Sequence, residues 1–383
     1  MLIEEQLAAI QFLTQEVGPR PATSVAEARA AAYINSRLRQ AGMEVDVQTF
    51  RAVPTESIPR GLLYLVMAAS PFVYLYNQPL ALGLAVAALL IFFAEEMVWP
   101  IFSSWLPGGE SQNIVGTRAA AQDGQQHLIV MSHMDSGRAN LLYHPRLVGN
   151  YRRFYLISLI AIVLLPILIG LGWLTGETWL WYAQLVPAGY ITLAFLLLLH
   201  QEIIMPWVPG ANDNASGVAV LLNLAEELEG LQHTTLWLVA TGSKEAGLHG
   251  ARAFLRHYPF PRESTYIINL DSVGQGQLGI IVWEGKLFAR QADPRLVELA
   301  GDSESKDITI DADPLVYRTT NTDAQVALVR GFRAMSIVAL EDGRPASRHW
   351  STDTLENIHP ELLERAGRLV IGIARQLDRQ AEE

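Results

Sequence analysis

The 383-residue chain contains no cysteine. This absence excludes a disulfide framework, catalysis by a thiolate and a metal site held by thiolates, and it is compatible with a reducing compartment. The chain also lacks an excess of basic residues, because 28 Lys and Arg stand against 39 Asp and Glu, for a formal charge of −11. No basic stripe offsets this acidity, which argues against a nucleic-acid partner.

Charge is nearly absent from two stretches, 61–101 and 154–201. Their 89 residues contain only three charged side chains, Glu95, Glu96 and Glu177. The other 294 residues carry the remaining 64, a proportion close to that of ordinary soluble proteins. The composition therefore predicts a soluble domain that is interrupted by two membrane-like segments. The N-terminus begins with acidic residues, which is not typical of a secretory signal, and we expect an amphipathic helix there.

Each apolar stretch is long enough for two helices that cross a bilayer, which takes about 20 apolar residues per helix. We expect four membrane helices in two transmembrane hairpins, at 61–76, 80–101, 154–174 and 179–199. Pro71 makes the first, short helix a candidate for a tilted, kinked or interfacial position. Trp and Tyr residues near the helix ends fit the aromatic belts of membrane proteins. The alternative is a buried core hairpin of a soluble protein, which would need an unusually large uncharged core.

Basic side chains indicate the orientation of these hairpins. They flank the apolar stretches on the side of the main domain, at Arg60, Arg146, Arg152 and Arg153, and neither hairpin tip has Lys or Arg. The positive-inside rule then places the N-terminus and the main domain in the cytoplasm. We therefore expect a multi-pass protein of the cell membrane with the lipid bilayer as a partner.

The rest of the chain, 1–60, 102–153 and 202–383, has the pattern of one soluble α/β domain. Short apolar runs predict strands at 43–50, 113–117, 128–131, 236–240, 266–270 and 335–340. Helical patterns lie at 25–41, 218–228 and 250–256. Continuous apolar strands that alternate with helices are typical of a mostly parallel central sheet flanked by helices.

Chemically active side chains lie where these strands end. Ligands of open α/β sheets bind outside the carboxyl ends of the strands, so we expect the side chains to meet at one edge. Imidazoles and carboxylates suit zinc, and an acid-rich set suits two ions that share a bridging carboxylate. The residues are His133, Asp135, Asp213, Glu245, Asp271 and His349.

Five motifs carry these residues. They are Ser-His-Met-Asp-Ser at 132–136, Gly-Ala-Asn-Asp-Asn-Ala-Ser-Gly at 210–217, Ser-Lys-Glu-Ala-Gly-Leu-His-Gly at 243–250, Ile-Asn-Leu-Asp-Ser-Val-Gly at 268–274 and His-Trp-Ser-Thr-Asp-Thr-Leu-Glu-Asn-Ile at 349–358. With these motifs the sequence resembles the di-metal exopeptidases of peptidase family twenty-eight, over essentially all of the soluble part. The resemblance implies the fold of the zinc aminopeptidases, of phosphorylase/hydrolase-like type.

The resemblance also implies a cofactor and roles for the motif residues. The cofactor would be two Zn²⁺ ions, which activate a water for attack on the N-terminal bonds of peptide substrates. Asp213 would bridge the two ions. The remaining ligands would be His133 and Asp271 for one ion and Glu245 and His349 for the other. Asp135 would orient the His133 ring through its other nitrogen.

The position of the general base departs from the family pattern. Active members have two adjacent glutamates, of which the first accepts the proton from water and the second binds zinc. Glu245 fits the second, but Lys244 stands at the first. An ammonium group cannot accept a proton, and loss of a general base typically costs ~10²–10⁴ in rate. We therefore predict that a native or engineered Lys244 inactivates or weakens this peptidase.

Two further expectations concern the substrate. Tyr317 lies near a loop that resembles the one shaping the substrate pocket, and it is a candidate oxyanion donor or a packing tyrosine. The stretch 154–201 is inserted between His133 and Asp213. This insertion suggests that the mouth of the site lies near the membrane surface and admits membrane-derived peptides.

The leading hypothesis is thus a membrane-bound aminopeptidase. The alternative is a non-catalytic membrane scaffold or binding protein on a peptidase fold, although such proteins tend to lose metal ligands and all five are present here. A third hypothesis, glutaminyl cyclisation on the same fold, is disfavoured by the complete second set of ligands. The sequence indicates no oligomeric state.

Overall fold

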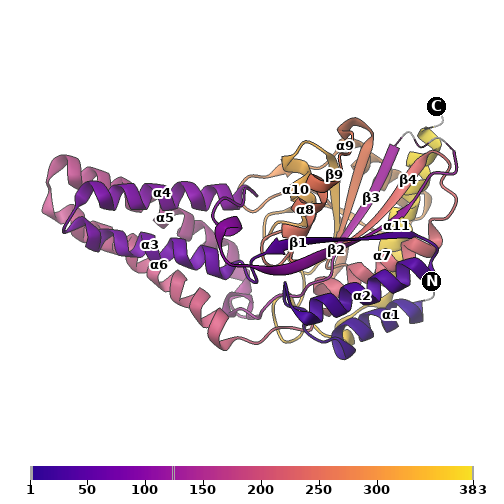
Figure 1. The fold of residues 1–383 in the computed structure, drawn as a ribbon, viewed down its shortest axis with the longest axis horizontal. Coiled ribbons are helices and arrows are strands. Elements are labelled where there is room, and N and C mark those ends of the chain that lie inside the picture. The colour runs from indigo at the N-terminus through magenta and orange to yellow at the C-terminus, as the bar shows by residue number, and fades with distance from the viewer. Residues whose placement is uncertain (1–2, 123, 125, 382–383) are drawn as a thin grey trace. The chain divides into compact units, whose positions relative to one another are not determined.

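The computed structural model describes residues 3–122, 124 and 126–381 of the chain. They form two compact units (Figure 1). The α/β unit comprises Met1–Pro54, Gly108–Arg138 and Trp207–Glu383, and the helical unit comprises Thr55–Pro107 and Ala139–Pro206. Both stretches that are poor in charge lie within the helical unit.

A nine-stranded sheet runs through the described part of the α/β unit. Its strands are β1 (Glu44–Ala52), β2 (Gly109–Arg118), β3 (Gln126–His133), β4 (Thr234–Thr241), β5 (Thr265–Asp271), β6 (Gln277–Glu284), β7 (Arg290–Gln291), β8 (Asp313–Tyr317) and β9 (Arg333–Leu340). They follow the order β1-β2-β4-β3-β5-β9-β6-β7, and β8 pairs with β6. All six strands expected from the apolar runs are confirmed, whereas the runs miss β6, β7 and β8.

The sheet is mixed rather than mostly parallel. Its four central strands β4, β3, β5 and β9 are parallel neighbours. At one edge β1 and β2 run antiparallel, and at the other β6 runs antiparallel to both β9 and β7. The continuous apolar runs predict only the centre correctly, because they reflect burial on both faces rather than strand direction. Every residue of β5 is buried, as that reasoning requires.

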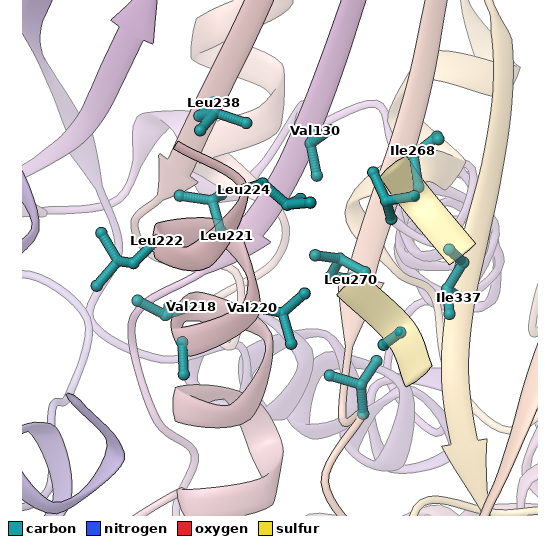
Figure 2. Packing of buried hydrophobic residues seen from close by; sticks show 14 of the residues in the cluster. Val130, Val218, Val220, Leu221, Leu222, Leu224, Leu238, Ile268, Leu270 and Ile337 are labelled. Carbon is teal, nitrogen blue, oxygen red and sulfur yellow. The ribbon is translucent and has the colours of Figure 1, made fainter. Parts of the chain in front are cut away.

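Helix α7 (Ser216–Glu227) packs against the centre of this sheet (Figure 2). Its Val218 and Leu221 belong to one buried cluster with Val130, Leu238 and Ile268 of three central strands. Side chains alternate between the faces of a strand, so only every second residue of each strand enters this cluster. The same cluster includes residues of α1 (Ile3–Gln11), α2 (Val25–Gln40), α9 (Pro294–Lys306) and α11 (Pro360–Gln380). Helices α8 (His249–His257) and α10 (Asp323–Val329) pack against each other and against other parts of the sheet.

The helical unit contains α3 (Ser57–Tyr74), α4 (Gln78–Glu96), α5 (Tyr151–Thr175) and α6 (Thr178–Ile204). Three segments are long and apolar enough to cross a membrane, Gln78–Glu96, Val148–Thr175 and Thr178–Ile204. The expectation of four membrane helices is thus supported for these three candidates and not for α3. Helix α3 begins earlier than the apolar run and so includes Arg60. Its guanidinium pairs at 2.8 Å with Glu96, the last residue of α4.

The three apolar helices expose most of their surface within the described chain. Only 22%, 28% and 22% of their most apolar windows are buried. A hairpin in the core of a soluble protein would bury far more, so this exposure argues against that alternative. The turns also follow local rules: Asn77 caps α4 by accepting from Leu80 N–H at 3.0 Å, and Gly176 ends α5 with φ of +72°.

Candidate metal centre

The carboxyl ends of three parallel strands carry the candidate ligands to one edge of the sheet. His133 is the last residue of β3, Asp271 is the last residue of β5, and Glu245 lies in the loop after β4. Asp213 lies in the irregular turn η5 (Ala211–Ala215) that opens α7, and His349 lies in the loop after β9. This is the position that the strand-end argument predicts for a ligand site.

The first half of the cluster joins His133, Asp213 and Asp271. His133 Nε2 lies 3.1 Å from Asp213 Oδ1 and 3.9 Å from Asp271 Oδ2. All three side chains are only 1% exposed. These atoms therefore converge in a region from which bulk water is excluded.

The second half joins Asp213 with Glu245 and His349. His349 Nε2 lies 2.6 Å from Glu245 Oε2 and 3.7 Å from Asp213 Oδ2. Asp213 thus directs one oxygen to each half, which is the geometry of a bridging carboxylate. One ligand atom each from His133, Asp213 and Glu245 lies within 4.8 Å of the others. The structure brings all five predicted ligands together.

Lys244 lies among the carboxylates of this cluster. Its Nζ is 2.8 Å from Glu245 Oε1, 3.1 Å from Asp271 Oδ2 and 3.6 Å from Asp213 Oδ1. Burial and the nearby Arg348 would lower the pKa of Lys244, but the three carboxylates outweigh them and raise it well above its usual value. Lys244 is consequently a buried ammonium group and a poor proton acceptor.

Arg348 is a second cation in the cluster, and the motif analysis misses it. Its Nη2 lies 3.0 Å from Glu245 Oε1, and its Nε lies 3.4 Å from Asp213 Oδ2. Burial would raise the pKa of Glu245, but Lys244, His349 and Arg348 hold it well below its usual range. Each cation directly precedes a candidate ligand in the chain, which is the one sequence signal that points to Arg348.

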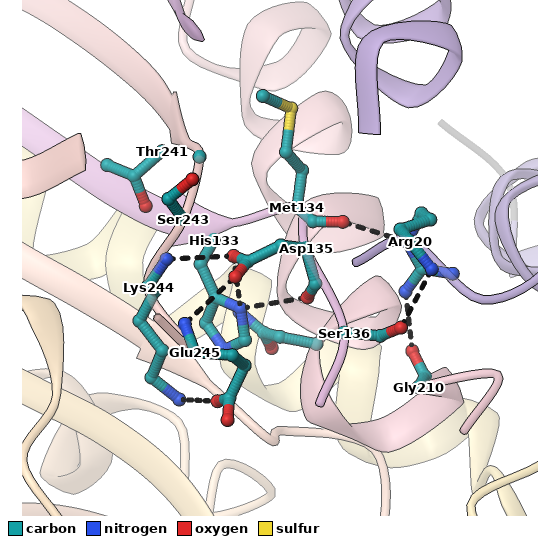
Figure 3. A network of polar contacts seen from close by, with 12 residues as sticks. Arg20, His133, Met134, Asp135, Ser136, Gly210, Thr241, Ser243, Lys244 and Glu245 are labelled. Carbon is teal, nitrogen blue, oxygen red and sulfur yellow. Dashed lines mark hydrogen bonds and ion pairs between the residues drawn. The ribbon is translucent and has the colours of Figure 1, made fainter. Parts of the chain in front are cut away.

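Asp135 has a different principal partner from the expected one. His133 Nδ1 lies 3.1 Å from the main-chain oxygen of Asp135 and 3.4 Å from its carboxylate. The carboxylate accepts the backbone N–H groups of Lys244 at 3.1 Å and of Glu245 at 2.8 Å (Figure 3). Asp135 therefore holds both the His133 ring and the loop of Glu245. Glu27, which the sequence analysis misses, accepts from Ser243 N–H in the same loop at 2.8 Å.

Arg20 links two ligand loops and is also missed by the sequence analysis. This fully buried guanidinium donates to the carbonyl oxygens of Met134 at 2.8 Å and Gly210 at 2.9 Å (Figure 3). The backbone N–H of Arg20 donates to Ser136 Oγ at 2.9 Å. A further bond reaches the carbonyl of Pro209 at 2.7 Å. These bonds fasten the loops of His133 and Asp213 to the N-terminal segment.

Tyr317 lies in a small apolar cluster. It is 1% exposed and packs with Ile281, Val338 and Leu340. Burial raises its pKa above the usual value. Such an apolar environment is typical of a packing tyrosine, which is the alternative to an oxyanion donor at this position.

The chemistry of the donor set fits zinc. Two imidazoles and three carboxylates are ligands that zinc accepts. Asp213 Oδ2 and Asp271 Oδ2 are buried and accept no hydrogen bond from the described residues, but Arg348 Nε lies 3.4 Å from the first and Lys244 Nζ lies 3.1 Å from the second. The cluster can therefore hold a divalent ion, subject to competition from its two internal cations.

The comparisons with known proteins concern the family and the fold of the chain. The sequence model of peptidase family M28 matches residues 200–374, which include Asp213, Glu245, Asp271 and His349. A comparison with curated proteins gave no match.

Solved structures show the same fold at low sequence identity. A zinc aminopeptidase from Bacillus subtilis matches with a TM-score of 0.59 and 15% identity, over 98% of this chain and 94% of that one. The aminopeptidase from Aneurinibacillus sp. strain AM-1 matches with a TM-score of 0.58 and 17% identity, over 98% of this chain and 93% of that one. A glutaminyl cyclase from Bacteroides thetaiotaomicron matches with a TM-score of 0.58 and 13% identity, over 97% of each chain. The match over residues 200–374 and the shared fold thus make this chain similar to the members of peptidase family M28.

Proposed function

We propose that this chain is a membrane-bound zinc metallo-exopeptidase of aminopeptidase type whose turnover is weakened by Lys244. The observation that carries the proposal is the convergence of five ligand-type side chains, with Asp213 between two halves. The fold alone does not decide the reaction, because aminopeptidases and a glutaminyl cyclase match it about equally well. A second set of ligands at Glu245 and His349 favours the peptidase.

Each residue has a separate task in this proposal. Asp213 would hold metal with both oxygens, His133 and Asp271 would complete one site, and Glu245 and His349 the other. Zinc, when bound, supplies a Lewis acid that polarises the scissile carbonyl and lowers the pKa of water. Asp135 keeps the loop of Glu245 in place through two backbone hydrogen bonds.

Lys244 limits this machinery because it holds a proton where a base is needed. Its three carboxylate neighbours stabilise the charged form, so the ammonium persists at neutral pH. Replacement of Lys244 by Glu restores a proton acceptor beside the ligands and should raise turnover by about 10²–10⁴-fold. The assay uses an aminoacyl substrate with zinc, and Lys244→Gln is the control that removes the charge without supplying a base. Equal rates for the Glu and Gln variants would contradict the role assigned to this position.

A non-catalytic membrane scaffold is the second candidate function. The contacts of Lys244 and Arg348 with the carboxylates favour it, since two internal cations already compensate the acidic cluster. A scaffold predicts that zinc leaves the melting temperature unchanged and that Lys244→Glu gains no hydrolysis. The peptidase proposal predicts that saturating zinc raises the melting temperature by mass action.

The membrane attachment is part of the proposal. Three exposed apolar helices support a multi-pass protein in a lipid bilayer, with 61–101 and 154–201 as hairpins within a peptidase domain. Basic residues on the domain side support a cytoplasmic location of that domain. A reporter fused after Glu383 tests the topology, and a periplasmic or extracellular signal would contradict it.

The substrate class follows from the chain order. The second hairpin separates His133 from Asp213 in the sequence, so we propose peptides released at the membrane as substrates. The test compares cleavage of one peptide in soluble form and tethered to vesicles by the restored Lys244→Glu enzyme. Equal rates would count against a membrane-derived substrate.

A further inference from the structure

The positions of Lys244 and Arg348 bear on how many metal ions the cluster holds. Lys244 Nζ contacts Asp271 Oδ2 at 3.1 Å and Asp213 Oδ1 at 3.6 Å. These are the two oxygens that His133 Nε2 also approaches, at 3.9 Å and 3.1 Å. The ammonium and the imidazole thus converge on the same two carboxylate oxygens of the first half, and the ammonium also contacts Glu245 Oε1 at 2.8 Å.

The second half is arranged differently. Arg348 Nη2 approaches Glu245 through Oε1, whereas His349 Nε2 approaches the other oxygen, Oε2, at 2.6 Å. The closest contact of Arg348 with Asp213 Oδ2 is 3.4 Å, from Nε. The guanidinium therefore contacts Asp213 Oδ2 but approaches Glu245 through a different oxygen from the one that His349 contacts.

The charge of the cluster gives the same result. With neutral imidazoles, the three ligand carboxylates, the carboxylate of Asp135 and the two internal cations leave a net charge of −2. One divalent ion changes it to 0, and a second would change it to +2. The side chains of Lys244 and Arg348 are only 2% and 3% exposed, so water screens such an excess poorly. A carboxylate in place of Lys244 would lower the total by two charges, which is the charge of one zinc ion.

We propose that the Lys244 ammonium takes the place of one metal ion, so that the chain binds a single divalent cation between Asp213, Glu245 and His349. This inference rests on the proposed metal centre and changes its stoichiometry. It makes Lys244 a substitute for a cofactor ion in the first half, in addition to a missing base. The ion that remains lies in the half that Arg348 flanks.

The stoichiometry of zinc tests the inference. The full-length protein is purified in detergent, equilibrated with zinc, freed of excess metal and measured by mass spectrometry of its metal content. We expect one zinc per chain in the wild type and two in both Lys244→Met and Lys244→Glu, because either change removes the ammonium. Arg348→Met is the matched control that removes the other cation, and it should still bind one.

Two ligand variants identify the occupied half. His349→Ala should lose the ion, whereas His133→Ala should keep it with an affinity within about threefold of the wild type. The opposite result would overturn the assignment of the halves. Thermal unfolding of each zinc-free variant shows whether the variant is folded. A variant that does not fold is replaced by the Gln substitution at the same position.

The failure of this inference is distinguishable from failure of the proposed function. Two zinc ions in the wild type would overturn the substitution by Lys244 but leave the metallopeptidase proposal intact. No zinc in the wild type or in Lys244→Glu would overturn both and support the scaffold. Two ions in Lys244→Glu but one in Lys244→Met would show that the carboxylate, rather than removal of the ammonium, admits the second ion, and would also overturn the inference.

Discussion

Lys244 forms an ion pair with its own neighbour in the chain, because its Nζ lies 2.8 Å from Glu245 Oε1. Side chains of adjacent residues in a regular strand point to opposite faces, so this contact depends on the loop conformation after β4. In that loop Ser243 has a left-handed φ of +52°. The turn directs both side chains into the metal centre, and it would direct an adjacent pair of glutamates there as well.

Arg20 is predicted to be necessary for stability although it lies far from the candidate ligands in the sequence. Arg20→Met leaves the buried carbonyls of Met134, Pro209 and Gly210 without their donor, and we expect a loss of about 3 kcal/mol or more in the free energy of unfolding. Denaturant unfolding measures the change. Arg29→Met, at an exposed helical position, is the control and should change stability by less than about 0.5 kcal/mol.

Gly137 is predicted to be intolerant of a side chain because of His349. A Cβ atom at Gly137 would lie 2.5 Å from His349 Nε2, so Gly137→Ala must displace the ring from Glu245. We expect at least a tenfold loss of zinc affinity, measured by competition with a chelating dye. Gly301→Ala introduces the same methyl group into α9 where nothing lies within 4 Å. An unchanged affinity in Gly137→Ala would show that His349 does not hold the ion.

Glu27 is predicted to make stability depend on pH. Burial, and next the charge of Asp135, raise the pKa of Glu27 to about 8 from 4.5. The folded state therefore retains a proton that the unfolded state releases, and this contribution to stability is complete below pH 4.5 and is lost as the pH rises to about 8. Glu27→Gln removes the dependence, so its stability relative to wild type should increase between pH 5 and 8 by up to about 1.4 kcal/mol per pH unit. Urea unfolding at several pH values checks the slope, and a parallel pair of curves would contradict the assignment.

The apolar helices are predicted to require lipid. Ile160 in α5 is 64% exposed, and Ile160→Arg places a charge on a surface that we assign to the bilayer. We expect an insertion penalty of about 2.5–3.5 kcal/mol and a lower yield in the membrane fraction. Val316→Arg is the matched control, because Val316 is 60% exposed but belongs to β8 of the α/β unit. A similar loss for both variants would indicate general misfolding rather than loss of a lipid contact.

The sequence locates His133, Glu245 and Asp271 because each follows a strand whose apolar run is visible by itself, whereas Asp213 follows α6 and is located by its motif. Burial of β3, β4 and β5 fixes where these strands end, and the motif residues at their ends then need little further information. Arg20 and Arg348 are not predictable in this way, since their partners depend on how distant loops pack. Strand β6 is missed because Gly274, Gly276 and Gly279 suggest a loop, although four consecutive apolar residues follow at 280–283.

The membrane prediction is not supported for α3, for a similar reason. Hydropathy locates the apolar run but not the residue at which the helix begins, and the extra first turn contributes Arg60. The apolar pattern also cannot predict that the sheet is mixed. A buried strand has the same apolar composition whether it runs parallel or antiparallel to its neighbours.

The bonds of Arg20 have a consequence for the order of events during synthesis. Its acceptors include Pro209 and Gly210, which follow α6, so the ribosome produces both hairpins before the Arg20 contacts can form. Arg20 and His133 are synthesised early, but the contacts of Arg20 with Pro209 and Gly210 cannot form until the last apolar helix has left the exit tunnel. Both hairpins are therefore synthesised before the candidate metal centre can close.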